Sequence, residues 1–145
     1  MDASYVDVIT TAAARLNASD VDGYLSNFQP DCLHWISGSP DSMPIPMPMP
    51  AFVESLQAMR AGLSGMHLEE LALFGVDNFV CAHWRTRGTH TAELFGMPPT
   101  QRAISFDTAE VYELDDTGRV RTSWAFGDPG QLFRQISDNP NGGEA

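Results

Sequence analysis

Residues 79–126, FVCAHWRTRGTHTAELFGMPPTQRAISFDTAEVYELDDTGRVRTSWAF, are the stretch that decides the fold. Apolar and polar side chains alternate along residues 79–90, 102–114 and 119–126, and a period of two is typical of half-buried strands. The Asp/Gly turn DDTG is typical of a hairpin, so we expect the strands on either side of it to be antiparallel. The stretch therefore predicts a meander of long strands, with the turn-rich loop ELFGMPPTQ between the first two.

The chain before this stretch has a mostly helical pattern. Apolar residues recur at helical spacing over residues 4–17, and further helices are expected from Ser19 to Pro30 and from Pro50 to Gly65. A short strand is expected over residues 32–37 and a further strand over residues 66–75. Three helices followed by antiparallel strands predict an α+β fold, in which the helices cover one face of a strongly curved antiparallel sheet. A cavity between the helices and such a sheet is a common place for a ligand.

The sequence contains no internal repeat and no linker. We therefore expect a single domain over residues 1–137 and a frayed polar tail over residues 138–145. The segment MPIPMPMP, residues 43–50, is expected to follow an extended path because its prolines lack backbone donors. It could act as a lid over a substrate, since methionine surfaces adapt to apolar ligands, or serve as a plain connection.

Composition restricts the classes of partner. The 145 residues carry a formal charge of −11, which argues against nucleic acid and against anionic membrane surfaces. No run of about 20 apolar residues is present to span a membrane, and the acidic N-terminus lacks a signal pattern, so we expect a cytoplasmic protein. Cys32 and Cys81 are expected to be reduced thiols. Small neutral or weakly charged organic molecules remain the natural class of ligand.

The alternation also predicts which side chains face the cavity. His90 and Glu110 fall on the inward face of their strands, and a carboxylate among apolar neighbours should have a raised pKa unless it is paired. Continuing the alternation of the last strand places Asp128 inward as well. If Leu114 lies near Val120 and the loop is centred on Met97, His90 and Asp128 lie about 12 Å apart, on opposite sides of a small substrate.

A set of residues in the last third of the chain resembles the SnoaL-like polyketide cyclase group. The resemblance is carried by Gly88, Thr89, His90, Phe95, Gly96, Pro98, Gly118, Arg119, Trp124, Asp128, Leu132 and Gln135. It implies the cone-shaped α+β fold of nuclear transport factor 2. It also implies a polyketide-tailoring enzyme of antibiotic biosynthesis, which closes a ring by intramolecular aldol condensation without metal or cofactor, with Asp128 as general base and then acid. Relatives hydroxylate, isomerise or open epoxides on polycyclic substrates, or only bind small molecules.

The sequence departs from the group in two places. MPIPMPMP replaces a segment that is often rich in glycine, and Glu110 stands where some cyclases carry histidine. Each of the three candidate catalytic residues could instead have a purely structural role. Asp128 could cap a helix over residues 130–136. His90 could bond a loop carbonyl at a hairpin edge, and Glu110 could pair with Arg102 or a tyrosine.

The predicted site therefore has two groups of residues. The predicted catalytic residues are Asp128, with a pKa shifted toward neutrality, His90 and Glu110. The predicted contacts to an aromatic or polycyclic polyketide are Trp35, Trp84, Phe95, Met97, Phe106, Thr108, Trp124 and Phe126, although core packing would also explain most of the aromatic ones. No metal site is expected, because His34, His67 and His83 lack ligand spacing. A homodimer is expected through the outer sheet face, with Cys81, His83, Asp107, Ala109 and Val111.

Overall fold

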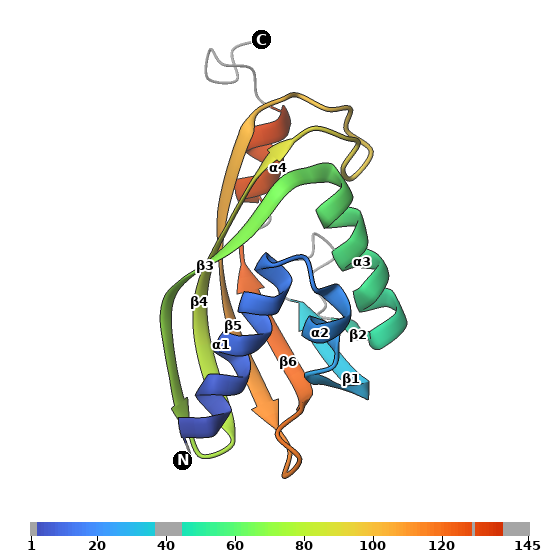
Figure 1. Ribbon diagram of the computed structural model, residues 1–145. Coiled ribbons are helices and arrows are strands. Elements are labelled where there is room, and N and C mark those ends of the chain that lie inside the picture. The colour runs from blue at the N-terminus through green and yellow to red at the C-terminus, as the bar shows by residue number, and fades with distance from the viewer. Residues whose placement is uncertain (1–2, 37–44, 129, 138–145) are drawn as a thin grey trace.

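A computed structural model describes residues 3–36, 45–128 and 130–137 of the chain. The predicted tail, residues 138–145, and Met43 and Pro44 of the proline-rich segment lie outside the described residues. The helices are α1 (Ala3–Asn17), α2 (Val21–Leu25), α3 (Met49–Gly62) and α4 (Gly130–Ser137). The strands are β1 (Phe28–Ile36), β2 (Ile45–Pro48), β3 (Leu63–Val76), β4 (Phe79–His90), β5 (Ala103–Leu114) and β6 (Val120–Gly127), as Figure 1 shows.

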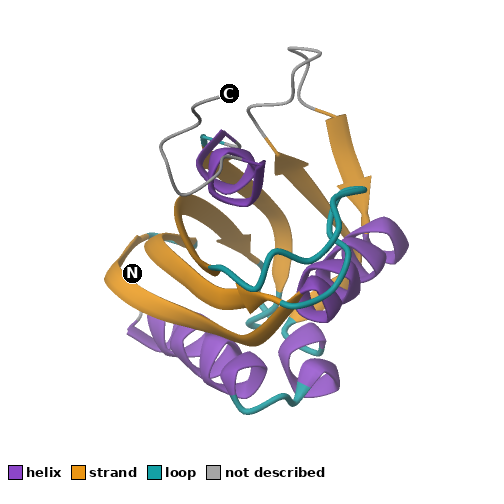
Figure 2. Ribbon diagram, turned by 90° about the horizontal axis from the view of Figure 1, so that it is seen from above, coloured by secondary structure: helices purple, strands orange, loops and turns teal. Residues whose placement is uncertain are grey.

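All six strands belong to one sheet with the order β2-β1-β6-β5-β4-β3. Figures 1 and 2 show that the sheet curves strongly and that helices pack against it, which confirms the predicted α+β class. The sheet is antiparallel as predicted except at one pair of strands, since β1 runs parallel to β6. Both strands enter the sheet at the same end: the N–H of Val120 donates to the carbonyl of Asn27, directly before β1.

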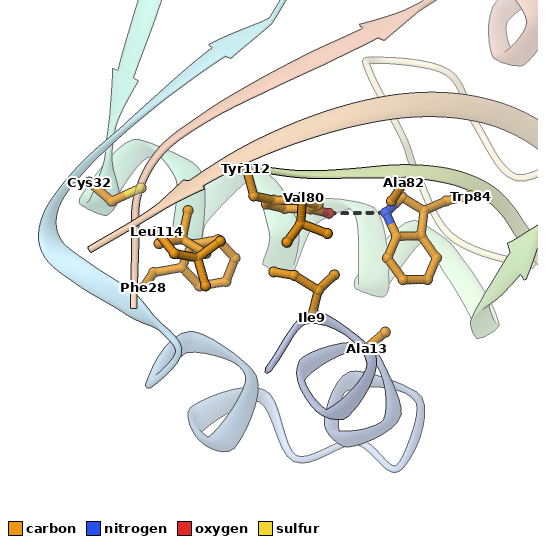
Figure 3. Close-up of a cluster of buried hydrophobic side chains, with 10 residues drawn as sticks. Ile9, Ala13, Phe28, Cys32, Val80, Ala82, Trp84, Tyr112 and Leu114 are labelled. Carbon is orange, nitrogen blue, oxygen red and sulfur yellow. Dashed lines mark hydrogen bonds between the residues drawn. The ribbon is translucent and has the colours of Figure 1, made fainter. Parts of the chain in front are cut away.

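Two buried clusters lie between the helices and the sheet. The first packs the buried stripe of α1 against the middle of the sheet and includes Ile9, Ala13, Val80, Trp84 and Leu114 (Figure 3). The second consists of Leu63, Leu94, Ile104, Leu132 and Ile136, and it joins α4 to the far end of β5 and to the loop before it. The core is therefore divided along the inner face of β5, with α1 over one part and α4 over the other.

Several boundaries differ from the sequence-based expectation for local reasons. The cap of α2 is Asp20, whose side chain accepts from the N–H of Gly23, because Ser19 has a left-handed backbone with φ of 66°. Helix α3 ends at Gly62, because the next residue, Leu63, has an extended backbone with φ of −118° and ψ of 99°. Strand β3 therefore starts at Leu63. The short strand β2, which pairs with β1, was not expected.

A bulge in β6 reverses the side chains of the last strand. Leu114 pairs with Val120 as expected, but Glu113 pairs with Thr122, so the register shifts by one residue at this point. Because side chains alternate with a period of two, one extra residue moves each later side chain to the other face. Ser123 is therefore buried on the inner face, and Trp124 is on the outer face, opposite to the prediction.

Candidate active site

An apolar groove of about 310 Å³ runs between α3, α4 and the ends of β5 and β6. We call it the α3–α4 groove. Its main apolar lining residues are Met59, Phe95, Phe106, Phe126, Leu132 and Phe133, and its polar residues include Thr108 and Asp128. Strand β6 ends at Gly127, opposite Thr108, and α4 binds the edge of β5 beyond that point. The groove therefore reaches side chains from both faces of the sheet.

Asp128 lies on the rim of this groove, at the start of α4. Its Oδ1 accepts from the N–H of Gly130 at 2.8 Å, and its Oδ2 accepts from Arg134 at 2.9 Å. These two interactions, with that of Arg134 the larger, lower the pKa of a carboxyl group that is 57% exposed. The expectation of a pKa shifted toward neutrality was therefore wrong for the free protein. The side chain also has the capping role that was the alternative.

Glu110 faces a different and much smaller cavity. This crevice has a volume of about 20 Å³, lies under α1, and is lined by Tyr24, Trp84, Glu110 and Tyr112 among others. Trp84 Nε1 donates to the hydroxyl of Tyr112 at 3.0 Å (Figure 3), and Tyr112 is hydrogen-bonded to Glu110. Burial raises the pKa of Glu110 despite the bond from Tyr112. Of the two pairings considered, the tyrosine is present, while Arg102 donates to the carbonyl of Gln135.

His90 is fully buried at the end of β4 and is not on the rim of a pocket. Its Nδ1 accepts from the N–H of Thr100 at 3.3 Å and lies 3.0 Å from the hydroxyl of the same residue. In the described part of the chain, Nε2 has no hydrogen-bond partner. The register also differs from the prediction by two residues, because Gly88 and not His90 pairs with Ile104; a shift of two keeps His90 on the expected inner face. His90 therefore fixes the loop over residues 91–102.

The predicted contact residues divide between four environments. Phe95, Phe106, Thr108 and Phe126 line the α3–α4 groove, and whether they bind substrate stays a prediction. Trp84 lines the crevice, and Met97 packs against the second core cluster. Trp35 and Trp124 pair with each other on the outer face, where Trp124 lies 6.5 Å from Phe79, so their expected place in the pocket was wrong.

The sequence-based prediction did not include the groove residues of α3 and α4. Met59, Leu132 and Phe133 belong to helices whose positions follow from long-range packing. The apolar spacing of Leu132 and Ile136 would have identified a buried helical face, but not what it covers. In residues 3–36, 45–128 and 130–137, no three His, Cys, Asp or Glu side chains form a group that could hold a metal ion. No helix in the described ranges is long and apolar enough to cross a membrane.

Several solved structures have the same fold as this chain. AclR, a proposed hydroxylase from Streptomyces galilaeus, has a TM-score of 0.84 and 20% identity, covering 95% of this chain and 98% of its own. IdmH, a proposed polyketide cyclase from Streptomyces antibioticus, has a TM-score of 0.77 and 21% identity, covering 91% and 97%. A proposed polyketide cyclase from Xanthomonas campestris has a TM-score of 0.77 and 15% identity, covering 92% and 97%. At these identities the likeness shows the fold alone.

The sequence itself shows the family. No match was found among the curated proteins. Residues 6–136 match the model of the family described as SnoaL-like polyketide cyclase, which is most of the 145-residue chain. The chain therefore belongs to the SnoaL-like polyketide cyclase family.

Proposed function

We propose that this protein closes a ring of an aromatic polyketide by intramolecular aldol condensation, with Asp128 as general base and then acid. The observation that carries the proposal is an exposed carboxylate on the rim of an apolar groove. A volume of about 310 Å³ is within the range of small-molecule sites, and its aromatic lining suits a planar polycyclic ligand. The proposed reaction needs no metal or organic cofactor.

Asp128 is better suited to this role than Asp107, the other carboxylate of the groove. Asp107 accepts from Arg85 at 2.8 Å and from His83 at 3.0 Å, and these bonds lower its pKa to about 2. Asp128 is held by Arg134 and by one backbone N–H, and its carboxylate is more exposed. Its lowered pKa keeps it ionised at neutral pH, which is the form that a general base requires.

The proposed chemistry begins when the carboxylate of Asp128 removes a proton from the carbon next to a substrate carbonyl. The resulting enolate carbon attacks a second carbonyl carbon of the same molecule, which forms the new carbon–carbon bond and an alkoxide. The alkoxide takes the proton back from Asp128, and loss of water completes a condensation. A bound substrate would displace water from Asp128 and raise its pKa, which makes it a stronger base in the complex.

The first test exchanges Asp128 for Asn. We expect Asp128→Asn to lower kcat by about 10²–10⁴-fold on an aromatic polyketide that carries two reactive carbonyls, because the proton acceptor is removed. Asp116→Asn, in the exposed DDTG turn, is the control and should retain wild-type kcat. Ring formation is followed by absorbance and by NMR of the product. Near-wild-type turnover by Asp128→Asn would exclude Asp128 as the base.

The mass of the product separates this reaction from the other activities considered. Aldol addition leaves the substrate mass unchanged and condensation removes one water, whereas hydroxylation adds one oxygen and epoxide opening adds one water. An isomerase also leaves the mass unchanged, but it forms no new ring, which NMR would show. Mass spectrometry of the same reaction mixtures therefore tests the reaction type.

A second candidate function is binding of a small molecule without turnover. It is favoured by the separation of the three predicted catalytic residues: Asp128 is in the groove, Glu110 is in the crevice, and His90 is in the core. A pure binding protein would take up the same aromatic compounds, would show no pH-dependent turnover, and would lose little affinity on the Asp128→Asn exchange.

A further inference from the structure

We infer that Phe95 is a specificity-determining contact, which holds the part of a polycyclic ligand that lies beyond the reacting centre. The inference rests on the proposed function, because it takes the α3–α4 groove as the substrate site. Phe95 is at the tip of the loop that follows His90, and it lines the groove together with Phe133 of α4. Their ring centroids lie 5.4 Å apart with the planes tilted by 45°, so the two rings form an aromatic pair at the groove.

The loop is built to hold Phe95 in one place. Leu94 and Met97 exchange both backbone hydrogen bonds at 3.0 Å, which leaves Phe95 and Gly96 as a two-residue turn. Leu94 is buried in the second core cluster, and Met97 packs against the same cluster. On the far side of the loop, His90 is bonded to Thr100. The tip is therefore fixed on both sides, and of the described loop residues Phe95 is the one that lines the groove.

The backbone at this tip does not favour phenylalanine. Phe95 has φ of 51° and Gly96 has φ of 79°, which is the pattern of a turn that usually contains Asn, Asp or Gly. A bulky side chain with positive φ is an uncommon and strained arrangement. The ring is also 51% exposed, so core packing does not compensate for the strain. A residue that is both strained and exposed at a groove is readily explained by a ligand that covers it.

The test uses two variants of Phe95 and two probe molecules. Phe95→Asn fits the backbone of the turn but lacks the ring, whereas Phe95→Leu keeps apolar bulk without a planar face. The probes are dihydroxyanthraquinone, which has three fused rings, and acetophenone, which has one. Leu71→Asn, which removes an exposed apolar side chain of β3 outside the groove, is the control. Binding is measured by isothermal titration and stability by thermal unfolding.

We expect Phe95→Asn to raise Tm by about 2–4 °C, because the strain is relieved. The same variant should weaken binding of the tricyclic probe about 10-fold or more, since a Phe ring contact is lost. Binding of acetophenone should change by less than about 3-fold, because the inference assigns to Phe95 only the part of a larger ligand beyond its first ring. Phe95→Leu should give an intermediate affinity for the tricyclic probe at a Tm near that of the wild type. Leu71→Asn should bind both probes as the wild type does.

The other outcomes separate this inference from the proposed function. If the wild type binds the tricyclic probe and Phe95→Asn binds it equally well, the inference is wrong while the role of Asp128 is unaffected. If Phe95→Asn loses affinity but Asp128→Asn retains turnover, the inference holds and the proposed base is wrong. A wild type that binds neither probe would exclude both, because the groove would then not accept planar aromatic compounds. A lower Tm for Phe95→Asn than for the wild type would show that the backbone at Phe95 is not strained.

Discussion

Glu110 places a carboxyl group inside the molecule with a tyrosine as its partner. Tyr112 is hydrogen-bonded to it, and burial raises the pKa of Glu110 above its ordinary value. The pKa of Tyr112 is also raised, first by burial and then by the charge of Glu110. Between the unfolded and folded pKa values of Glu110 the folded state binds more protons, so its contribution to stability falls as the pH rises through this range. Glu110 therefore destabilises the fold at neutral pH.

We predict that Glu110→Gln stabilises the protein at pH 7 by about 1–2 kcal/mol, because the amide fills the same space and carries no charge. Urea unfolding at pH 7 and pH 4 measures the free energy of unfolding of both proteins. The stabilisation by Glu110→Gln should be smaller at pH 4, where Glu110 is protonated. Glu113→Gln on the outer face of the same strand is the matched control. Its pKa is lowered by Arg121, so this exchange should not stabilise at pH 7. A Gln variant less stable than the wild type would mean that Glu110 is ionised and well paired.

At the scale of elements, His34 joins the start of α3 to two strands of the sheet. It comes from β1, and its Nδ1 lies 2.7 Å from the hydroxyl of Ser123 in β6. Its Nε2 lies 3.2 Å from the sulfur of Met49, and its ring stacks on Phe52 with centroids 3.7 Å apart. Burial lowers the pKa of His34 to about 4. The attachment of α3 therefore requires a neutral imidazole.

We predict that His34 makes the protein less stable in acid. Between pH 6.5 and about 4 the unfolded chain binds the proton and the folded chain does not, so the free energy of unfolding falls as the pH falls. The loss from this residue is at most about 3 kcal/mol. His34→Asn, which can keep a bond to Ser123, should remove this part of the pH dependence, whereas the exposed His67→Asn should not. The free energy of unfolding is measured by urea unfolding across this pH range. If it changes with pH equally in the wild type and in His34→Asn, the predicted role of His34 is wrong.

At the scale of the whole molecule, the outer face of the sheet carries a patch of apolar side chains. Phe74, Phe79, Val111, Trp124 and Phe126 lie on it, and Phe74 is 58% exposed. Exposed apolar surface of this kind is typical of a protein interface. Ion pairs flank the patch, with Arg85–Asp107 on one side and Arg121–Glu113 on the other. We therefore propose that two copies associate through this face.

We predict a homodimer in sedimentation velocity experiments. Val111→Glu, at the centre of the face, should convert it to a monomer, because a charge would be buried against the partner. Thr11→Glu on the exposed side of α1 adds the same charge elsewhere and should leave the dimer intact. The chain carries a formal charge of −11, so moderate salt should strengthen the dimer by screening repulsion. Monomers of the wild type at high concentration and moderate salt would contradict the interface.

The sequence by itself determined the family, the α+β class and the inner faces of two strands. The range predicted for β4 is the range observed, because alternation and a turn mark both of its limits. Burial of Val80, Trp84, Ile104 and Leu114 follows the predicted inward set of β4 and β5. These features are local in the chain, since a two-residue period and turn residues act within a few positions.

Only the tertiary structure decided which candidates share a cavity. One bulge before Thr122 turned Trp124 outward, and the loop that bonds back to His90 through Thr100 and Arg102 left His90 in the core rather than on a pocket rim. Packing of α4 on the edge of β5 made the groove beside Asp128, and packing of α1 enclosed Glu110 in a separate crevice. Register shifts and helix positions depend on contacts between residues far apart in the chain, and no local pattern contains them.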